Sequence, residues 1–366
     1  MTNHHPVSRA ADFSKQFGMK IPVLMAPMAG ACPPALARAV ARAGGMGATG
    51  ALLDSPSKID EWVRAFRADN GGDLPLQMNL WIPDPSPRRD PEHEARVRAF
   101  LANWGPVVPA DAFESVVAPV FDQQVDALIA ARPTALSSIM GLYSPAVVER
   151  LHQKKIAWFA CVTTVAEARA AEQAGADVIV AQGAEAGGHR GAFDAVQGVD
   201  KAAGLFALLP QVVDAVSVPV VATGGIADAR GVAAALLLGA SAVQIGTGLL
   251  RTDESTVAPA WSSAIGQASP DATRLTRAFS GRWGRAIASD YVLKAHSSQA
   301  PEPAPYPVQR GLTGAMRQQA IRDNDISRLQ AWAGQSGALA QTGPAGDIVQ
   351  QIWADACQLL THAGGD

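Results

Sequence analysis

A single histidine in a glycine-rich loop is the side chain best placed for acid–base chemistry in this sequence. His189 lies in the stretch VIVAQGAEAGGHRGAF, residues 178–193, just after an apolar run with the composition of a buried strand. Gly187 and Gly188 precede it, supply no packing surface, and allow the backbone to come close to a ligand. A free imidazole has a pKa of about 6.5, so it can accept a proton or donate a hydrogen bond near neutral pH. We therefore expect His189 to be catalytic, as a base; the alternative is a loop histidine that only caps backbone groups.

The carboxylate close to His189 in the sequence and the other histidines are less informative. Glu185 is a nearby carboxylate, and we expect it either to orient the imidazole ring or to face solvent. Six further histidines lie in polar or helical surroundings and are expected at the surface: His4, His5, His93, His152, His296 and His362.

Short apolar runs recur along the first 250 residues, and a glycine turn follows each of the last two runs. Thr223-Gly224-Gly225 precedes a helix expected to begin near Asp228, and the turn QIGTG, residues 244–248, ends the final run. Backbone N–H groups in such turns, together with the N-terminus of a helix, form a cradle for an anion. In parallel barrels the loops after strands seven and eight commonly hold a phosphate. The pair of turns therefore predicts a phosphate-bearing cofactor.

The first apolar run and two amide side chains extend this predicted site. Ala26, Pro27 and Met28 are small or compact residues at a strand end, where a flat ring can lie against the backbone. Asn79 and Gln182, near the ends of two other runs, offer amide groups to ring or side-chain oxygens. A flat ring, a polar tail and a phosphate together describe FMN better than a simple sugar phosphate.

The elements that must position these residues follow one repeating order. Short apolar runs alternate with Ala-rich segments of helical length, which predicts a parallel sheet with crossover helices. The runs fall near residues 21–28, 45–50, 76–81, 135–140, 156–162, 178–183, 219–224 and 242–247. The helices are expected near 33–43, 57–68, 144–153, 164–174, 204–216 and 228–238. Eight strands favour an α/β fold of the TIM (β/α)8 barrel type. An open doubly wound sheet would need a GxGxxG turn after the first strand, and APMAGA, residues 26–31, is not one.

The chain is longer than a barrel requires, and the excess follows the last strand. We expect residues 1–250 to form the barrel, with the Pro-rich segment 82–134 as an elaborated connection that includes a helix near 92–103. Residues 251–340 are expected to form a smaller, mainly helical cap over the barrel mouth. The last helix, within 341–366, is expected to pack back on the barrel. Helices in this half are predicted near 257–266, 313–322, 326–333 and 346–361.

Composition excludes several classes of function. The chain has 366 residues, a formal net charge of −3 and no large Lys/Arg cluster, so nucleic acid is not an expected partner. Its three cysteines are widely spaced, which argues against a disulfide framework or a zinc site and favours the cytoplasm; no metal is expected. The uncharged stretch 231–250 contains four glycines and three polar residues, so we interpret it as a buried helix and strand rather than a membrane span.

Several motifs together make the chain similar to a known enzyme family. They are KIPVLMAPMAG (20–30), AGGMGATG (43–50), QMNLW (77–81), AQGAEAGGHRG (181–191), ATGGI (222–226), GASAVQIGT (239–247), TRAFSGR (276–282), PYPVQ (305–309) and WAGQ (332–335). From about Lys20 to the C-terminus, the chain resembles the FMN-dependent nitronate monooxygenases, formerly called 2-nitropropane dioxygenases. The EAGGH segment with its flanks is the specific part of the likeness.

The resemblance implies a TIM barrel with a smaller helical domain, FMN without bound metal, and oxidation of alkyl nitronates by O₂ to a carbonyl compound and nitrite. His189 matches the family's catalytic histidine. Met25 departs from the family pattern, in which glutamine is common. The full set of cofactor-binding residues that we expect comprises Ala26, Pro27, Met28, Asn79, Gln182, Gly187, Gly188, Gly224, Gly225, Gln244, Ile245, Gly246 and Thr247.

Other functions stay open at this point. Related barrels share the EAGGH loop, so an NAD(P)H-dependent flavin reductase that acts on an enoyl thioester or a quinone is the nearest alternative. A non-catalytic barrel that binds flavin or phosphate is the second. The expected partners are a small nitronate such as propionate 3-nitronate and O₂, not a membrane, and the chain is expected to act as a monomer or a homodimer.

Overall fold

A closed barrel of eight parallel strands forms the larger part of the molecule. The computed structural model describes residues 5–68, 73–109, 111–112, 119–196 and 198–362. The strands are β1 (Val23–Met25), β2 (Gly47–Gly50), β3 (Leu76–Trp81), β4 (Ala135–Ile139), β5 (Ala157–Val162), β6 (Val178–Gln182), β8 (Val220–Thr223) and β9 (Ala242–Ile245). They pair in the order β1-β9-β8-β6-β5-β4-β3-β2, and a parallel bridge between Leu24 and Met46 closes the ring. The predicted TIM barrel is confirmed, and each strand lies within the predicted run.

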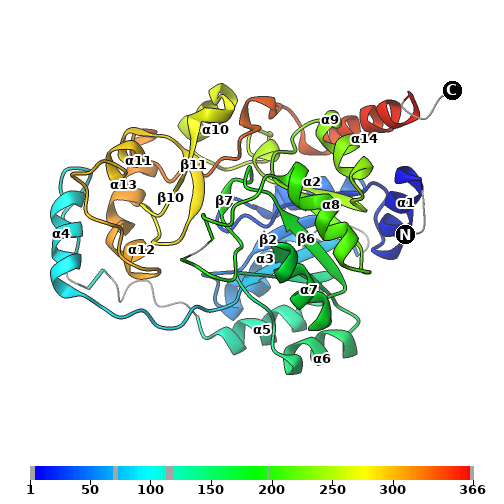
Figure 1. Cartoon of the computed structure of the whole chain (residues 1–366), viewed down its shortest axis with the longest axis horizontal. Helices are drawn as coiled ribbons and strands as arrows, with labels where there is room; N and C mark the ends of the chain where they lie inside the picture. The colour runs from blue at the N-terminus through cyan, green and yellow to red at the C-terminus, as the bar shows by residue number, and fades with distance from the viewer. Residues whose placement is uncertain (1–4, 69–72, 110, 113–118, 197, 363–366) are drawn as a thin grey trace.

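Helices cover the outside of the barrel, one after nearly every strand (Figure 1). They are α2 (Pro34–Arg42), α3 (Pro56–Arg67), α5 (Phe121–Ala130), α6 (Pro145–Gln153), α7 (Val165–Gln173), α8 (Leu205–Ala215) and α9 (Ala229–Leu237). Ser55, Ser144, Thr164 and Asp228 each accept a hydrogen bond from a backbone N–H in the first turn of the helix that follows. Such caps satisfy donors that the helix itself leaves free, which is why these helices begin where the sequence predicts.

The amino-terminal end of the barrel is plugged by a helix that was not predicted. In α1 (Pro6–Gln16), Phe13 is 2% exposed, and its ring centroid lies 4.8 Å from that of Phe17. The Phe17 ring lies 5.1 Å from the ring of Phe159, which projects from β5 into the barrel. Aromatic contacts of this kind bury much apolar surface. Because this end is filled, the carboxyl ends of the strands are left for a site.

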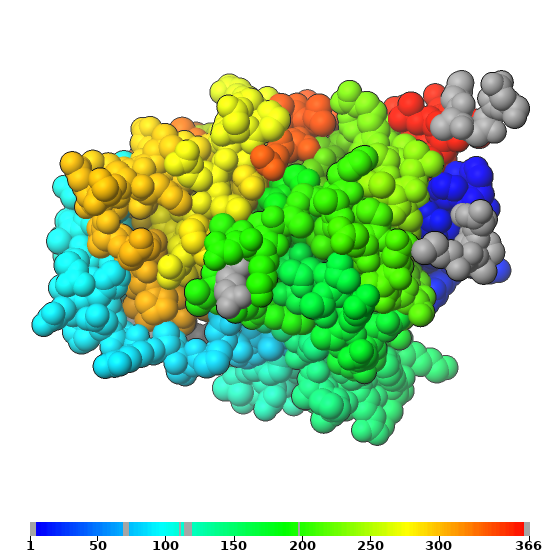
Figure 2. Space-filling model, viewed as in Figure 1, coloured from blue at the N-terminus to red at the C-terminus, as the bar shows by residue number. Residues whose placement is uncertain are grey.

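A second group of elements lies beside the carboxyl ends of the strands (Figure 1). It contains a small antiparallel sheet, β10 (Thr273–Thr276), β11 (Gly284–Ile287) and β7 (Gly188–His189). Helices α10 (Pro259–Gln267), α11 (Asp290–Ala295), α12 (Val308–Leu312) and α13 (Gly314–Asp323) surround it. We call these elements the cap. Helix α4 (Pro91–Leu101), from the connection after β3, packs with α12 and lies along the outer side of the cap (Figure 2).

The carboxyl-terminal helix returns to the barrel. Helix α14 (Ala345–His362) packs against α2 and α9, on the opposite side of the molecule from the cap (Figure 1). No helix of the described ranges is long and apolar enough to cross a membrane.

One helix prediction, for residues 326–333, is wrong. Helix α13 ends at Asp323, the next residue, Asn324, is left-handed with φ of 51°, and the chain continues as turns and extended backbone. Trp332 there forms an antiparallel bridge with Ala286 of β11. The pairing with β11 requires an extended chain, so tertiary contact overrides the local helical preference.

Candidate active site

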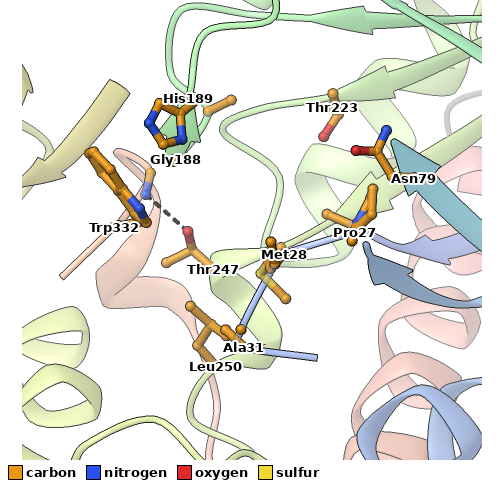
Figure 3. Close-up of a pocket in the computed structure, with 18 of the residues that line it drawn as sticks. Pro27, Met28, Ala31, Asn79, Gly188, His189, Thr223, Thr247, Leu250 and Trp332 are labelled. Atoms are coloured by element: carbon orange, nitrogen blue, oxygen red, sulfur yellow. Dashed lines mark hydrogen bonds between the residues drawn. The ribbon is translucent and has the colours of Figure 1, made fainter. Parts of the chain in front are cut away.

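A cavity of about 670 Å³ opens at the carboxyl ends of the barrel strands and extends under the cap. Of the residues predicted to bind cofactor or substrate, all but one line it. They are Ala26, Pro27, Met28, Asn79, Gln182, Gly187, Gly188, His189, Gly224, Gly225, Gln244, Gly246 and Thr247. Ile245 is the exception, because its side chain is fully buried in the barrel core; Met25 is buried there as well. Figure 3 shows His189 and Trp332 on one side of this space, with Pro27, Asn79 and Thr223 on the other.

His189 is held in the cavity wall by backbone pairing and by one side-chain hydrogen bond. Its strand β7 pairs with β11, so that His189 lies opposite Gly284. The Nε2 atom lies 2.7 Å from the Oγ of Ser280, a fully buried serine in the connection between β10 and β11. The imidazole ring lies between Trp81 at 4.8 Å and Trp332 at 4.7 Å, measured between ring centroids. These contacts leave the ring little freedom to turn.

The surroundings of His189 keep its imidazole neutral. Burial of the ring lowers its pKa to about 3, and the positive charges of Arg310, Arg282 and Arg317 add to the effect. A neutral imidazole has one ring nitrogen that can accept a proton. The ring is therefore unprotonated, with one nitrogen available to accept a proton, throughout the neutral pH range.

Gln182 organises the loop that carries His189. Its Oε1 accepts a hydrogen bond from the backbone N–H of Gly191 at 2.8 Å, and its Nε2 donates to the carbonyl of His189 at 3.1 Å. Arg190, which is 2% exposed, donates to the carbonyl of Gly183 at 2.8 Å. Gln182 lines the cavity as predicted, yet most of its hydrogen-bonding capacity is used within the loop.

Glu185 does neither of the things expected of it. Its carboxylate accepts the backbone N–H of Leu205 at 2.8 and 3.0 Å, at the first residue of α8. A carboxylate at the N-terminus of a helix is stabilised by free N–H groups and by the helix dipole. The hydrogen bond to the imidazole is formed instead by Ser280, which lies ninety-one residues after His189 in the sequence.

The two predicted glycine turns present free N–H groups to the cavity. The backbone N–H groups of Gly224, Gly225, Gly246 and Thr247 have no acceptor in the described part of the chain. Gly224 and Gly225 have φ of 108° and 72°, a left-handed conformation that glycine adopts without strain. The Oγ1 of Thr247 accepts the N–H of Gly334 at 2.9 Å, which joins this turn to the WAGQ segment (Figure 3). Free N–H groups in turns that line one cavity suit a phosphate group.

The barrel floor of the cavity combines small residues with amide groups. A Cβ added at Gly246 would lie 3.2 Å from the Cβ of Ala26, so only glycine leaves this surface flat. The Oε1 atoms of Gln77 and Gln244 are buried without a hydrogen-bond partner among the described residues. The Nδ2 of Asn79 donates to the Oγ of Ser137 at 2.9 Å. Unpartnered buried acceptors are rare in folded proteins and point to a ligand that donates hydrogen bonds to them.

Gln77 was overlooked in the sequence, although it lies in the QMNLW motif two residues before Asn79. Its position on β3, two residues from a predicted site residue on the same face of the strand, is the signal that could have identified it. Among the cap residues that line the cavity, Arg310 and Arg317 gave no such signal, and Trp332 stood out only as the first residue of the WAGQ motif.

The thiol nearest the cavity is inert. Cys161 lines the barrel side of the cavity, and burial raises its pKa to about 12. A protonated thiol is a poor nucleophile, so covalent chemistry at Cys161 is not supported. Within the ranges that the structure describes, no three His, Cys, Asp or Glu side chains gather as they would to hold a metal ion.

Comparisons with known proteins agree with this geometry. The family model described as nitronate monooxygenase matches residues 11–355. A probable nitronate monooxygenase of Staphylococcus saprophyticus is 33% identical over 349 residues, covering 94% of this chain and 97% of that protein. The solved structure of nitroalkane oxidase from Streptomyces ansochromogenes is similar with a TM-score of 0.85 and 32% identity, over 96% of this chain and 99% of that one.

A more distant solved structure, FabK from Thermotoga maritima, has a TM-score of 0.75 and 26% identity, over 97% of this chain and 98% of its own. The family model spans nearly the whole chain, and the curated relative is matched along almost its entire length. With the TIM barrel and the histidine-bearing cavity at its mouth, these matches show that the chain belongs to the nitronate monooxygenase family of oxidoreductases.

Proposed function

We propose that the protein binds FMN in this cavity and uses O₂ to oxidise alkyl nitronates, such as propionate 3-nitronate, to a carbonyl compound and nitrite. Membership of the nitronate monooxygenase family supports the oxidation of nitronates in general. The observation that carries the finer proposal is the neutral imidazole of His189, which shares one cavity with the N–H cradle of the glycine turns.

The residues of the cavity fit FMN. The free N–H groups of Gly224, Gly225, Gly246 and Thr247 suit its phosphate. The unpartnered Oε1 atoms of Gln77 and Gln244 suit hydrogen-bond donors on the ring or the ribityl chain. Ala26, Pro27 and Met28 offer a low surface for a flat ring. When bound, the flavin supplies the electron transfer between the nitronate and O₂.

The side chains of this protein then have separable tasks. His189 accepts the proton from the carbon next to the nitro group when the substrate is a neutral nitroalkane. An anionic nitronate has already lost that proton and requires no base. Trp81 and Trp332 pack against the imidazole, which helps to hold its position. Arg310 and Arg317 line the same cavity and give it a positive potential that attracts an anion.

The proposal is tested by purification and anaerobic mixing. If the purified protein shows a flavin spectrum, or gains one after FMN is added, FMN is supported as its cofactor. Rapid bleaching of that spectrum by propionate 3-nitronate, and not by NADH, supports the nitronate reaction, with nitrite measured after O₂ is admitted. Rapid bleaching by NADH instead would favour a flavin reductase. A protein that binds no flavin even with added FMN would overturn the proposal.

We also propose a reducing, cytoplasmic setting. Cys32, Cys161 and Cys357 are all free thiols, which fits a compartment where disulfides do not persist. Fractionation of the cells of origin, with activity followed in each fraction, tests this.

A further inference from the structure

Arg310 differs from the other arginines around the imidazole because its guanidinium has no partner. It lies on α12 and lines the cavity from the cap side. No hydrogen bond or ion pair forms between its guanidinium and any residue that the structure describes. Its backbone carbonyl is engaged, because it accepts a hydrogen bond from Nη2 of Arg317 at 2.9 Å.

The two neighbouring arginines are fully used in holding the cap together. Arg282 donates to Asp84 at 2.5 Å and to the carbonyl of Ala192 at 2.8 Å. Arg317 donates to Thr313 at 3.1 Å and to the Oε1 of Gln330 at 3.2 Å. Arg282 therefore joins segments far apart in the sequence. Arg317 ties the backbone of Arg310 to the side chain of Gln330 within the cap. Arg310 makes no such link and faces the cavity with all its side-chain donors free.

A second free donor lies on the same side of the cavity. The Oε1 of Gln330 accepts a hydrogen bond from Nη1 of Arg317, and its Nε2 is buried without a partner among the described residues. Arg310, Gln330 and His189 line the same cavity. These donors come from segments after residue 300, whereas the glycine cradle directly follows β8 and β9 of the barrel, so the two donor groups belong to different parts of the molecule.

The chemistry of an unpartnered, partly buried guanidinium calls for a planar anion. Burying a cation without a partner is costly, and a bound anion removes that cost. The guanidinium fork matches two oxygens on one central atom, as in a carboxylate. A nitronate carries its negative charge on the same planar O–X–O arrangement, and so does nitrite.

We propose that Arg310, assisted by the Nε2 of Gln330, is the anchor for a planar oxyanion of the substrate. This inference rests on the proposed function and adds a binding residue to it. The oxyanion is either the nitronate group itself or a carboxylate elsewhere on the substrate. Held in this way, the substrate lies beside His189 with its charge neutralised, and a nitroalkane bound there is more acidic because its anion is stabilised.

The test is a titration of the flavin-loaded protein with nitrite and with propionate, both planar oxyanions, and with chloride as a spherical anion. Binding is followed by flavin absorbance and by the change in tryptophan fluorescence, to which Trp81, Trp261 and Trp332 in the cavity wall contribute. We expect Arg310→Met to weaken nitrite and propionate binding by about 10- to 100-fold. Arg310→Lys should weaken it less, because lysine keeps the charge but loses the fork. Arg322→Met, an exposed position on α13, is the matched control and should bind as the wild type does.

Two substrates then identify the group that is held. If Arg310→Met raises KM equally for propyl-2-nitronate and propionate 3-nitronate, the nitronate group is the anchored oxyanion. If KM rises only for propionate 3-nitronate, the anchored group is its carboxylate. The inference would be overturned if Arg310→Met binds nitrite and propionate as tightly as the wild type does and both KM values are unchanged. A protein that binds nitrite through Arg310 but oxidises no nitronate would keep the anion site and refute the proposed function alone.

Discussion

The Nε2 atom of His189 and the Oγ atom of Ser280 lie 2.7 Å apart, across the small sheet that joins the histidine loop to the cap. The same hydroxyl accepts the backbone N–H of Arg282 at 3.3 Å and donates to the carbonyl of that residue at 3.2 Å. A serine has one proton to donate. The geometry allows that proton to go to the carbonyl of Arg282 or to the Nε2 of His189. We predict the first arrangement, in which Nε2 carries a hydrogen and donates it to Ser280. Nδ1 is then the unprotonated ring nitrogen and the one that can act as base.

We therefore predict that Ser280→Ala slows proton abstraction without removing the base. Loss of a hydrogen bond that orients the imidazole should lower kcat for a neutral nitroalkane about tenfold, while the rate with a preformed nitronate changes little. The ¹⁵N shifts of the His189 ring, assigned with a His189→Asn sample, should show the Nε2–H tautomer in the wild type and a mixture in the variant. An Nδ1–H tautomer in the wild type would refute this account.

Ser289→Ala is the matched control for that variant. Ser289 is 8% exposed, and its hydroxyl has no partner in the described part of the chain. Its removal should leave both rates and the histidine tautomer unchanged. Ser280→Thr keeps a hydroxyl at the contact and should recover part of the lost rate.

His189→Asn should separate binding from proton transfer. Asparagine fills similar space but cannot accept the proton, so kcat for a neutral nitroalkane should fall about 10²- to 10⁴-fold. Flavin content should be unchanged, because the glycine turns proposed to hold the FMN phosphate follow β8 and β9, away from the strand that carries His189. Turnover of the nitroalkane at the wild-type rate would show that His189 is not the base.

The pH dependence of the reaction should lack the inflection usual for histidine. Burial first, and then the charges of Arg310, Arg282 and Arg317, lower the pKa of His189 to about 3. The neutral base therefore persists as pH falls from 8 to 5. We expect kcat/KM for a neutral nitroalkane to show no loss centred near the free value of about 6.5. The lowered pKa would be contradicted if kcat/KM of the wild type fell with a midpoint near that free value for a neutral nitroalkane but not for a preformed nitronate.

The same shift makes a prediction for stability. In the unfolded chain His189 binds a proton below about pH 6.5, whereas in the folded protein it does so only near pH 3. Between these values the unfolded state holds more protons, so His189 makes the folded protein less stable as pH falls. Chemical denaturation at pH 7 and pH 5 should show a smaller loss of unfolding free energy in His189→Asn than in the wild type.

Gly187→Ala should damage the site through the backbone. A Cβ at this position would lie 2.5 Å from the backbone nitrogen of Gly334 and 2.9 Å from the Oγ1 of Thr247. Overpacking of this kind costs about 1–3 kcal/mol, so the melting temperature should fall by several degrees and flavin retention should drop. In Gly314→Ala the added Cβ meets no atom within 4 Å, and this control should melt at or above the wild-type temperature. Equal melting temperatures for both variants would refute the close approach.

Much of the fold could be predicted from the sequence because its signals are local. Apolar runs, glycine punctuation and capping residues act over a few residues, and they located all eight barrel strands and most barrel helices. Helix α1 was missed because its few buried residues lie in a polar segment, and β7, β10 and β11 because strands of two to four residues show no clear alternation. The predicted helix at 326–333 is absent because Trp332 pairs with β11.

The sequence by itself determined the barrel, the glycine turns at its mouth and the choice of His189, since each depends on residue types within a short window. Only the tertiary structure decided what surrounds the imidazole. Ser280, Trp81 and Trp332 reach it from three distant segments, Glu185 turns away to cap α8, and Arg310 enters the cavity without a partner. Such contacts result from how the cap packs on the barrel, and packing across a hundred residues leaves no periodic signal in the chain.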